Sequence, residues 1–223
     1  MKPKTVIRLP LLLLAGFLLL MGSMGSSCAK LLGKKDSYKE IGGDTNLDAN
    51  KVGSEQKGTL KLNGSSLGTQ AVGKVIKNVG GIIDVNLKLT IPTQYRSLIS
   101  PSVIDAGGNV NLTASFKNST EGIAYINKSG KQFVIGRYDG KVGDTWSYTT
   151  TGSGRRTIER KVISKSTTDD FPWGFMNIKV ITAEQTLPYP GFKKAVYKFN
   201  HKFGFVYCEI HLEDGSVLST TVI

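Results

Sequence analysis

The side chains that could take part in catalysis are few and lie near the end of the chain. His201 and His211 are the only histidines, and Glu209 stands two residues before His211. On an extended strand residues two apart share a face, so the Glu209 carboxylate could orient the His211 imidazole. A Ser–His–acid triad would also need a serine poised beside that imidazole. We therefore expect His211 to be a surface histidine, and we assign no catalytic residue.

Cys208 lies on the side of the same strand that we assign to the core. Small or aliphatic side chains alternate with larger and polar ones here. The small or aliphatic ones are at even positions, like Cys208 itself: Gly204, Val206, Cys208, Ile210 and Leu212. This pattern predicts that Cys208 is a small buried hydrophobe rather than a nucleophile. The sequence contains no paired cysteine motif, no HExxH helix and no calcium loop. We expect neither a metal nor a cofactor.

The first 27 residues have the layout of an export signal. Lys2, Lys4 and Arg8 make a positive end, Leu9 to Met21 is almost wholly apolar, and a short run of small residues follows. The apolar run is shorter than the roughly 20 residues that a membrane-spanning helix needs. The pattern therefore predicts a cleaved signal peptide over residues 1–27.

Cys28 follows this leader directly. The sequence Gly25-Ser26-Ser27-Cys28 resembles the lipobox of bacterial lipoproteins, in a form found in the Bacteroidetes type. The resemblance implies that Cys28 carries fatty acyl chains such as palmitate and becomes the new N-terminus. It also implies a lipid-anchored protein of the bacterial cell envelope, with the outer membrane as the expected location. The alternative is ordinary cleavage near Ser27 or Ala29, which would release a periplasmic protein.

The net charge of +12 falls to +9 when the three positive charges of the leader are removed. In the cytosol such a charge would suggest nucleic acid, which export excludes as a partner. An exported basic protein meets anionic lipid headgroups or other polyanions instead. The lysines are scattered, so a well-hydrated surface explains them equally well.

The mature chain divides into a short polar segment and one domain. Residues 28–56 contain glycine, asparagine and aspartate without a sustained apolar period, which predicts an acylated cysteine followed by a flexible tether. From residue 57 to residue 223 we expect a β domain, within which a sub-boundary could fall near 137–141. No segment of this domain keeps a helical period for 12 residues or more, and the best helical candidate is the short run Gln94–Ser100.

Alternation of apolar and polar residues predicts the strands. Ile83, Val85, Leu87, Leu89 and Ile91 alternate with polar residues, as do the apolar residues of 110–116. Further strands are expected near 57–62, 69–78, 122–127, 131–137, 144–150, 155–164, 175–184, 194–200, 203–212 and 215–222. Hairpin turns are expected at Asn127–Gly130, Thr151–Gly154 and Asp214-Gly215. Clean alternation favours antiparallel sheets with one wet face. The expected class is all-β, as an antiparallel sandwich or a strongly curved half-barrel.

The second half of the domain resembles a group of uncharacterised β-rich bacterial envelope lipoproteins. The resemblance covers residues 138–223 and rests on a strand with Gly143, Trp146 and Tyr148, then on Phe203-Gly204-Phe205-Val206-Tyr207 ahead of Glu213-Asp214-Gly215. It implies a β-rich envelope domain and no particular activity.

Two loops have the most unusual composition. Ten of the 19 aromatic residues fall between 171 and 207, and prolines interrupt the strand pattern at Phe171–Met176 and Leu187–Phe192. Aromatic rings in loops can stack on sugars or fill an apolar pocket. Trp173, Phe175, Tyr189 and Phe192 are our candidate ligand-binding residues. The alternative is a loop that folds back to close the core.

These observations predict a lipid-anchored envelope protein whose β domain binds or supports rather than catalyses. Its partner would be a glycan, a lipid or another envelope protein. A second hypothesis is a carrier that holds a lipid or other apolar ligand on a curved sheet. A third is a hydrolase based on carboxylates, although spacing pairs none of them.

Overall fold

The computed structural model describes residues 39–91, 93, 96, 104–127, 129–149, 156–188 and 191–223. One short 3₁₀ helix, η1 (Asp48–Asn50), precedes the strands. The strands are β1 (Glu55–Leu62), β2 (Ser65–Val79), β3 (Ile82–Thr90), β4 (Asn109–Ser119), β5 (Gly122–Ile126), β6 (Gln132–Arg137), β7 (Thr145–Thr149), β8 (Thr157–Lys165), β9 (Phe171–Trp173), β10 (Met176–Ile178), β11 (Ile181–Thr186), β12 (Phe192–Asn200), β13 (Gly204–Leu212) and β14 (Val217–Val222).

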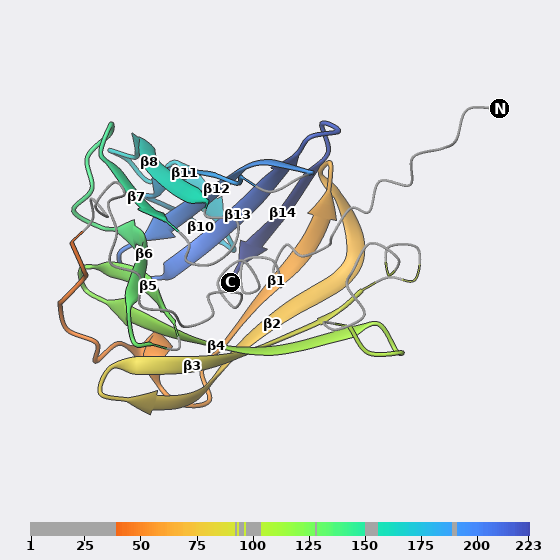
Figure 1. The fold of residues 1–223 in the computed structure, drawn as a ribbon, viewed down its shortest axis with the longest axis horizontal. Coiled ribbons are helices and arrows are strands. Elements are labelled where there is room, and N and C mark those ends of the chain that lie inside the picture. The colour runs from red at the N-terminus through yellow and green to blue at the C-terminus, as the bar shows by residue number, and fades with distance from the viewer. Residues whose placement is uncertain are drawn as a thin grey trace.

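Twelve of these strands form one antiparallel sheet that curves until it is nearly closed into a barrel (Figure 1). Their order is β6-β5-β4-β3-β2-β1-β14-β13-β12-β11-β8-β7, and β9 and β10 make a separate hairpin. The first strand of the chain, β1, therefore pairs with the last, β14. The two edges of the sheet are β6 and β7. The predicted all-β class is confirmed, and the architecture is the strongly curved form.

The alternation seen in the sequence places side chains as expected on most strands. Ile83, Leu89 and Ile91 are buried, whereas Val85 and Leu87, which have the same parity, are half-buried. The predicted strand at 175–184 is instead divided into β10 and β11, and the two belong to different sheets. The turn predicted at Thr151–Gly154 and the helical candidate Gln94–Ser100, apart from Arg96, lie outside the described residues.

The two edge strands meet through side chains. The carbonyl oxygen of Val134 on β6 accepts hydrogen bonds from Trp146 Nε1 on β7 and Arg160 Nη1 on β8, each at 2.8 Å. The rings of Phe133 and Tyr148 pack edge to face next to these bonds, with centroids 4.7 Å apart. The barrel is thus closed by side-chain contacts at the seam between β6 and β7. The sub-boundary considered near 137–141 falls on the connection between these two strands.

Aromatic rings occupy much of the interior. Tyr197 and Phe199 of β12 are each 1% exposed and lie beside Phe205 of β13. A Cβ on Gly136 of β6 would lie 2.8 Å from the ring of Phe199. Because real Cβ atoms do not approach so closely, only glycine lets β6 lean onto β12 at this point. The interior is therefore packed from opposite parts of the sheet.

Residues 39–54, which we call the N-terminal strap, are packed against the barrel. The side chain of Ile41 is buried with Ala124 and Val134 on the outer face of β5 and β6, and its backbone exchanges hydrogen bonds with the Gln132 side chain. In Figure 1 the orange strap runs beside β5 and β6 before the chain enters β1. This differs from the flexible tether expected over 28–56: within the described chain, the strap is part of the domain. The strap is polar in composition because its groups form hydrogen bonds with the barrel, as Gly42 does with Glu121 and Asp44 with Thr120.

Asn50 fixes the second half of the strap. Its side chain donates to the carbonyl oxygens of Thr45 and Asn118 and accepts from Asn118 Nδ2, and its own carbonyl accepts from Asn78 Nδ2. Asn50 is 1% exposed. Water therefore could not replace the Asn50 side chain as a hydrogen-bond partner of these groups. One asparagine thereby joins the strap to β2 and β4.

Antiparallel connections alternate between two rims of the barrel. The N-terminal rim, where β1 begins, carries the connections at 80–81, 120–121, 138–144, 166–180 and 201–203, together with the C-terminal residue Ile223. The opposite rim carries those at 63–64, 127–131 and 213–216. The strap and the β9–β10 hairpin both belong to the N-terminal rim.

Replacement of Asn50 by alanine tests the role of the strap. Asn50→Ala leaves buried partners unsatisfied and should lower the free energy of unfolding by about 1–3 kcal/mol in chemical denaturation. The control is Asp48→Asn, which removes an exposed ion pair with Lys51 and should change it by less than about 0.5 kcal/mol. Equal stability of the two variants would contradict an integral strap.

Candidate functional site

The β9–β10 hairpin is the best candidate site, and it packs on the outer face of the barrel. Ile178 and Val180 are buried there with Val206 of β13, and Phe171, Trp173 and Phe203 pack around them. The Trp173 indole is stacked on Phe203 with centroids 4.3 Å apart, and its Nε1 donates to the carbonyl of Val222 at 2.6 Å. The hairpin is therefore fixed to the barrel by a small core of its own.

A bulge in β13 creates room for this second core. Lys198 pairs with Tyr207, but the next residue of β12, Phe199, pairs with Phe205, so Val206 is the extra residue. The extra residue reverses the alternation of the strand. Phe205 then contacts the interior rings of Tyr197 and Phe199, while Val206 lies under the hairpin. Val206 is buried, as the alternation in the sequence predicts, but it lies on the outer face of the barrel and not in the interior.

A cation completes the contact between the hairpin and β13. The Phe171 ring packs edge to face on Tyr207, and Lys198 Nζ lies 4.4 Å from the Phe171 centroid and 5.2 Å from that of Tyr207. A lysine held over two aromatic faces is stabilised by the ring quadrupoles. The base of the hairpin is thus rigid and positively charged.

The structure separates the candidate residues predicted from the sequence. Trp173 is half-buried, and Phe175 at the hairpin turn is fully exposed. Phe192 instead is 8% exposed and belongs to the barrel core, at the opposite end of β12 from the hairpin. Phe192 therefore does not share a surface with Trp173, because the strand that follows the loop directs its ring inward, and its role in ligand binding stays a prediction. Tyr189 and Cys28 lie outside the described residues.

The histidine and glutamate noted in the sequence form one hydrogen-bonded row on β13. His211 Nε2 lies 2.7 Å from Glu209 Oε1, and the Tyr207 hydroxyl donates to Glu209 Oε2 at 2.9 Å. Burial and this acidic acceptor raise the pKa of Tyr207 to about 12. Glu209 therefore orients the imidazole as the spacing suggested, and it holds a tyrosine as well.

A serine motif lies on a neighbouring part of the sheet. Gly64-Ser65-Ser66-Leu67-Gly68 matches G-x-S-x-G, but it joins β1 to β2, whereas the nucleophile elbow of a hydrolase joins a strand to a helix. Ser66 Oγ accepts a hydrogen bond from the N–H of Gly68. Across the sheet, Ser66 pairs with Lys61, Lys61 with Ser219, and Ser219 with Glu209, so Ser66 and Glu209 are three strand spacings apart. At about 4.8 Å per strand the two are about 14 Å apart. Ser66 is thus too far from His211 to be its nucleophile.

Cys208 is buried among the interior residues as its parity predicts. Burial, with a smaller contribution from Glu209, raises the pKa of its thiol. A thiol without access to solvent and with a raised pKa is unreactive at neutral pH. Cys208 acts as a core residue.

Arg160 is an interior charge that the sequence analysis missed. It is 1% exposed, its Cζ lies 5.2 Å from the centroid of the Tyr148 ring, and its Nε and Nη2 have no hydrogen-bond partner in the described part of the chain. Its strand partners are Trp146 and Gln185. The signal was available in the sequence, because Arg160 has the same parity as the apolar residues Ile158 and Val162.

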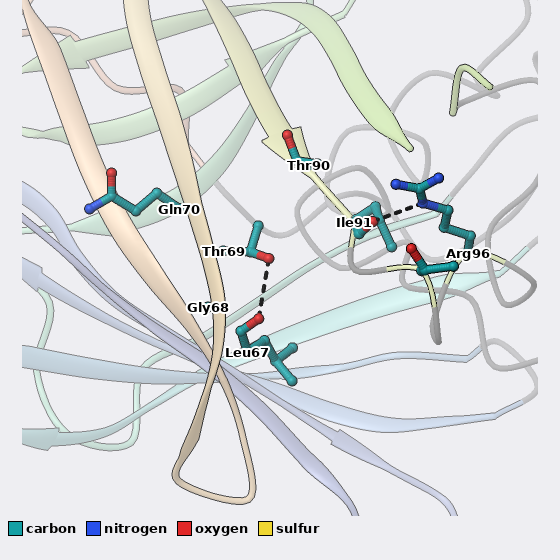
Figure 2. A pocket seen from close by; sticks show the side chains of 8 residues that line it. Leu67, Gly68, Thr69, Gln70, Thr90, Ile91 and Arg96 are labelled. Carbon is teal, nitrogen blue, oxygen red and sulfur yellow. Dashed lines mark hydrogen bonds between the residues drawn. The ribbon is translucent and has the colours of Figure 1, made fainter. Parts of the chain in front are cut away.

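A wide surface pocket of about 470 Å³ opens at the opposite rim. Figure 2 shows it between the first residues of β2, from Leu67 to Gln70, and the end of β3 at Thr90 with the following Ile91. Arg96 borders the pocket and donates from Nε to the Ile91 carbonyl at 3.1 Å. The guanidinium is thus held by the backbone, and the lining is mixed polar and apolar.

The described residues contain neither a candidate metal cluster nor a candidate membrane-spanning helix. No group of three or more His, Cys, Asp or Glu side chains in them is placed to hold a metal ion. Within the same residues, no helix has the length and apolar character needed to cross a membrane.

Comparisons with known proteins give a likeness in structure and none in sequence. No family model matches the chain, and no curated protein matches it. Among solved structures it is similar to a "putative exported protein with YmcC-like fold" from Bacteroides fragilis, with a TM-score of 0.45 and 12% identity, over 78% of this chain and 95% of that one. A likeness of this degree assigns no activity to the chain.

The hairpin predicts different losses of stability for the half-buried Trp173 and the exposed Phe175. Trp173→Ala removes a stacked ring and a hydrogen bond and should lower the free energy of unfolding by roughly 2–3 kcal/mol, less than for a fully buried ring. Phe175→Ala should change it by no more than about 0.5 kcal/mol, because the ring contacts mainly water. Chemical denaturation of both variants measures the difference. A large loss for Phe175→Ala would place its ring in a packed environment.

The thiol of Cys208 should be inert in the folded protein. In a Cys28→Ser variant, where Cys208 is the only cysteine, an aromatic disulfide reagent at pH 8 should react with no thiol until denaturant is added. The absorbance released before and after unfolding measures this. Rapid reaction of the native protein would mean that Cys208 is exposed.

Proposed function

We propose that this chain is an exported protein, held on an envelope membrane by acyl chains on Cys28, and that its barrel binds or supports a partner without catalysis. One observation carries the proposal: an export-type leader precedes Cys28, and Ile41, 13 residues after that cysteine, is packed against the β domain. Such a chain has a signal, an acylation point and a domain in the order of a lipoprotein. The outer membrane is the expected location.

The chemistry of the described side chains supports a non-catalytic role. Glu209 is bonded to Tyr207 and His211, and the Glu184 carboxylate is paired with Lys194 Nζ at 2.6 Å. In this arrangement both carboxylates serve as hydrogen-bond or ion-pair partners of neighbouring side chains. This arrangement favours binding over the carboxylate-based hydrolase.

The packing of the barrel favours a surface-binding domain over a carrier of apolar ligands. Rings from both halves of the sheet meet in the interior, including the edge-to-face pair of Phe133 and Tyr148 and the fully buried Tyr197 and Phe199. A carrier needs this volume for its ligand. The exposed Phe175 at the hairpin turn instead offers an apolar contact on the outside.

Substitution of Cys28 tests the anchor. The full precursor is expressed in a bacterial host supplied with labelled fatty acid. Cys28→Ser should abolish labelling and shift the protein from the membrane fraction to the soluble fraction, because no acyl chain then holds it. Gel fluorography and cell fractionation measure the two effects.

The matched control is Cys208→Ala, which removes the buried cysteine. This variant should keep both the label and the membrane location. A wild-type protein without label, or a Cys28→Ser variant that is still labelled, would show that Cys28 is not acylated.

A further inference from the structure

We propose that the N-terminal rim of the barrel is a docking surface that rests on the lipid bilayer, with the β2–β3 and β9–β10 turns inserted among the lipid headgroups. This inference rests on the proposed function, because the acyl chains on Cys28 would bring the rim to the membrane.

Exposed apolar side chains are concentrated at this rim. Among the described residues, nine large hydrophobic side chains are exposed, and all lie in the strap, in the connections of the N-terminal rim or on the adjoining ends of strands. They are Val52, Ile76, Val79, Ile82, Val142, Ile163, Phe175, Met176 and Ile223. Single exposed hydrophobics are common on protein surfaces, but their gathering at one end marks an interaction surface.

Two of the turns present apolar pairs. Val79 and Ile82 flank Gly80-Gly81 at the β2–β3 turn and are 63% and 39% exposed. Phe175 and Met176 follow Gly174 at the β9–β10 turn, and Met176 is 52% exposed. Aromatic and aliphatic side chains on projecting turns are suited to the boundary between headgroups and acyl chains. Each pair is small enough to enter that boundary without unfolding the strand that carries it.

The β9–β10 turn is held in place before any contact is made. Trp173, which pairs with Met176 across the hairpin, is fixed by the ring of Phe203 and the carbonyl of Val222. Little conformational entropy is then lost when the turn binds, which favours association. A fixed hairpin that presents the Phe175 ring to water is consistent with an external partner for that ring.

Lysines stand next to both apolar pairs. Lys77 precedes the β2–β3 turn, Lys179 follows β10, and Lys202 lies over Phe203 with Nζ 5.3 Å from the ring centroid; all three are exposed. Their ammonium groups can contact anionic headgroups while the apolar side chains enter below them. The exposed Asp169 and Asp170 belong to the same rim, so apolar insertion rather than net charge supplies the main contact.

The length of chain before the barrel selects the bilayer as the occupant. Lys39 stands 11 positions after Cys28, so the reach of the chain between them is at most about 40 Å at 3.3–3.6 Å per residue. A domain of this size is itself about 40 Å across. The carbonyl of Lys39 accepts from Nη1 of Arg137, the last residue of β6 at the N-terminal rim. The acylated cysteine would therefore keep this rim within one domain diameter of the membrane.

Environment-sensitive labels on the acylated protein test the docking. Phe175→Cys and Val79→Cys place a fluorophore at each turn, and Asp214→Cys places one at the β13–β14 turn of the opposite rim. The buried Cys208 thiol should not react. The labelled proteins are inserted in vesicles of phosphatidylethanolamine and phosphatidylglycerol, with and without nitroxide-labelled phospholipid. We expect blue-shifted emission and quenching by the nitroxide lipid at positions 175 and 79, and neither at position 214.

The outcomes separate this inference from the proposed function. If the protein is acylated and the labels at 175 and 79 report water, as the label at 214 does, the docking surface is overturned and the anchor stands. A blue shift that depends on protein concentration but not on the nitroxide lipid would indicate a second copy of the chain and would also overturn it. If the wild-type protein takes up no fatty acid, the proposed function fails and the docking inference fails with it.

Discussion

The carbonyl oxygen of Val134 is the point at which the two ends of the sheet are joined. It accepts from the Trp146 indole and the Arg160 guanidinium, and these two bonds replace the backbone ladder that is missing between the edge strands β6 and β7. An open sheet of this length would leave exposed edges and an uncovered apolar face. Closure at Val134 lets rings from both halves bury one another. A guanidinium in this position is costly to desolvate, and contact with the Tyr148 ring offsets part of that cost.

Closure at the seam also determines what can pack on the outside. The Val134 carbonyl faces the seam, while the Val134 side chain lies on the outer surface beneath Ile41 of the strap. On the other half of the sheet, the bulge at Val206 exposes an apolar side chain outward, and the β9–β10 hairpin covers it. The barrel thus has two external attachments, and both lead to the same rim. The strap contacts this rim where the Lys39 carbonyl accepts from Arg137, and the hairpin presents Phe175 there.

These features describe a protein that would act through its surface and its position. Its histidine is held by Glu209, its cysteine is buried, and its G-x-S-x-G sequence lies on a β-hairpin far from the imidazole. Among the described residues, exposed apolar side chains gather at the N-terminal rim, near the point where an anchored chain would arrive. A membrane contact at this rim would direct the opposite rim, with its pocket beside Arg96, toward the surrounding envelope. An envelope partner would then be met at that end of the barrel.

The sequence by itself determined the strands and the class of fold, because alternation with a period of two is a local property. It identified the burial of Cys208 and the pairing of Glu209 with His211 for the same reason. It did not reveal the seam, the strap or the place of Phe192. From the sequence, Asn50 is a turn residue, and its hydrogen-bond partner Asn118 is 68 residues away. Ile41 is likewise part of a tether in the sequence, and its hydrogen-bond partner Gln132 is 91 residues away. The local pattern of apolar and polar residues does not indicate partners so far apart in the sequence. Only the curvature of the whole sheet, which brings β6 back to β7, decided which of these residues are buried and which are left on the surface.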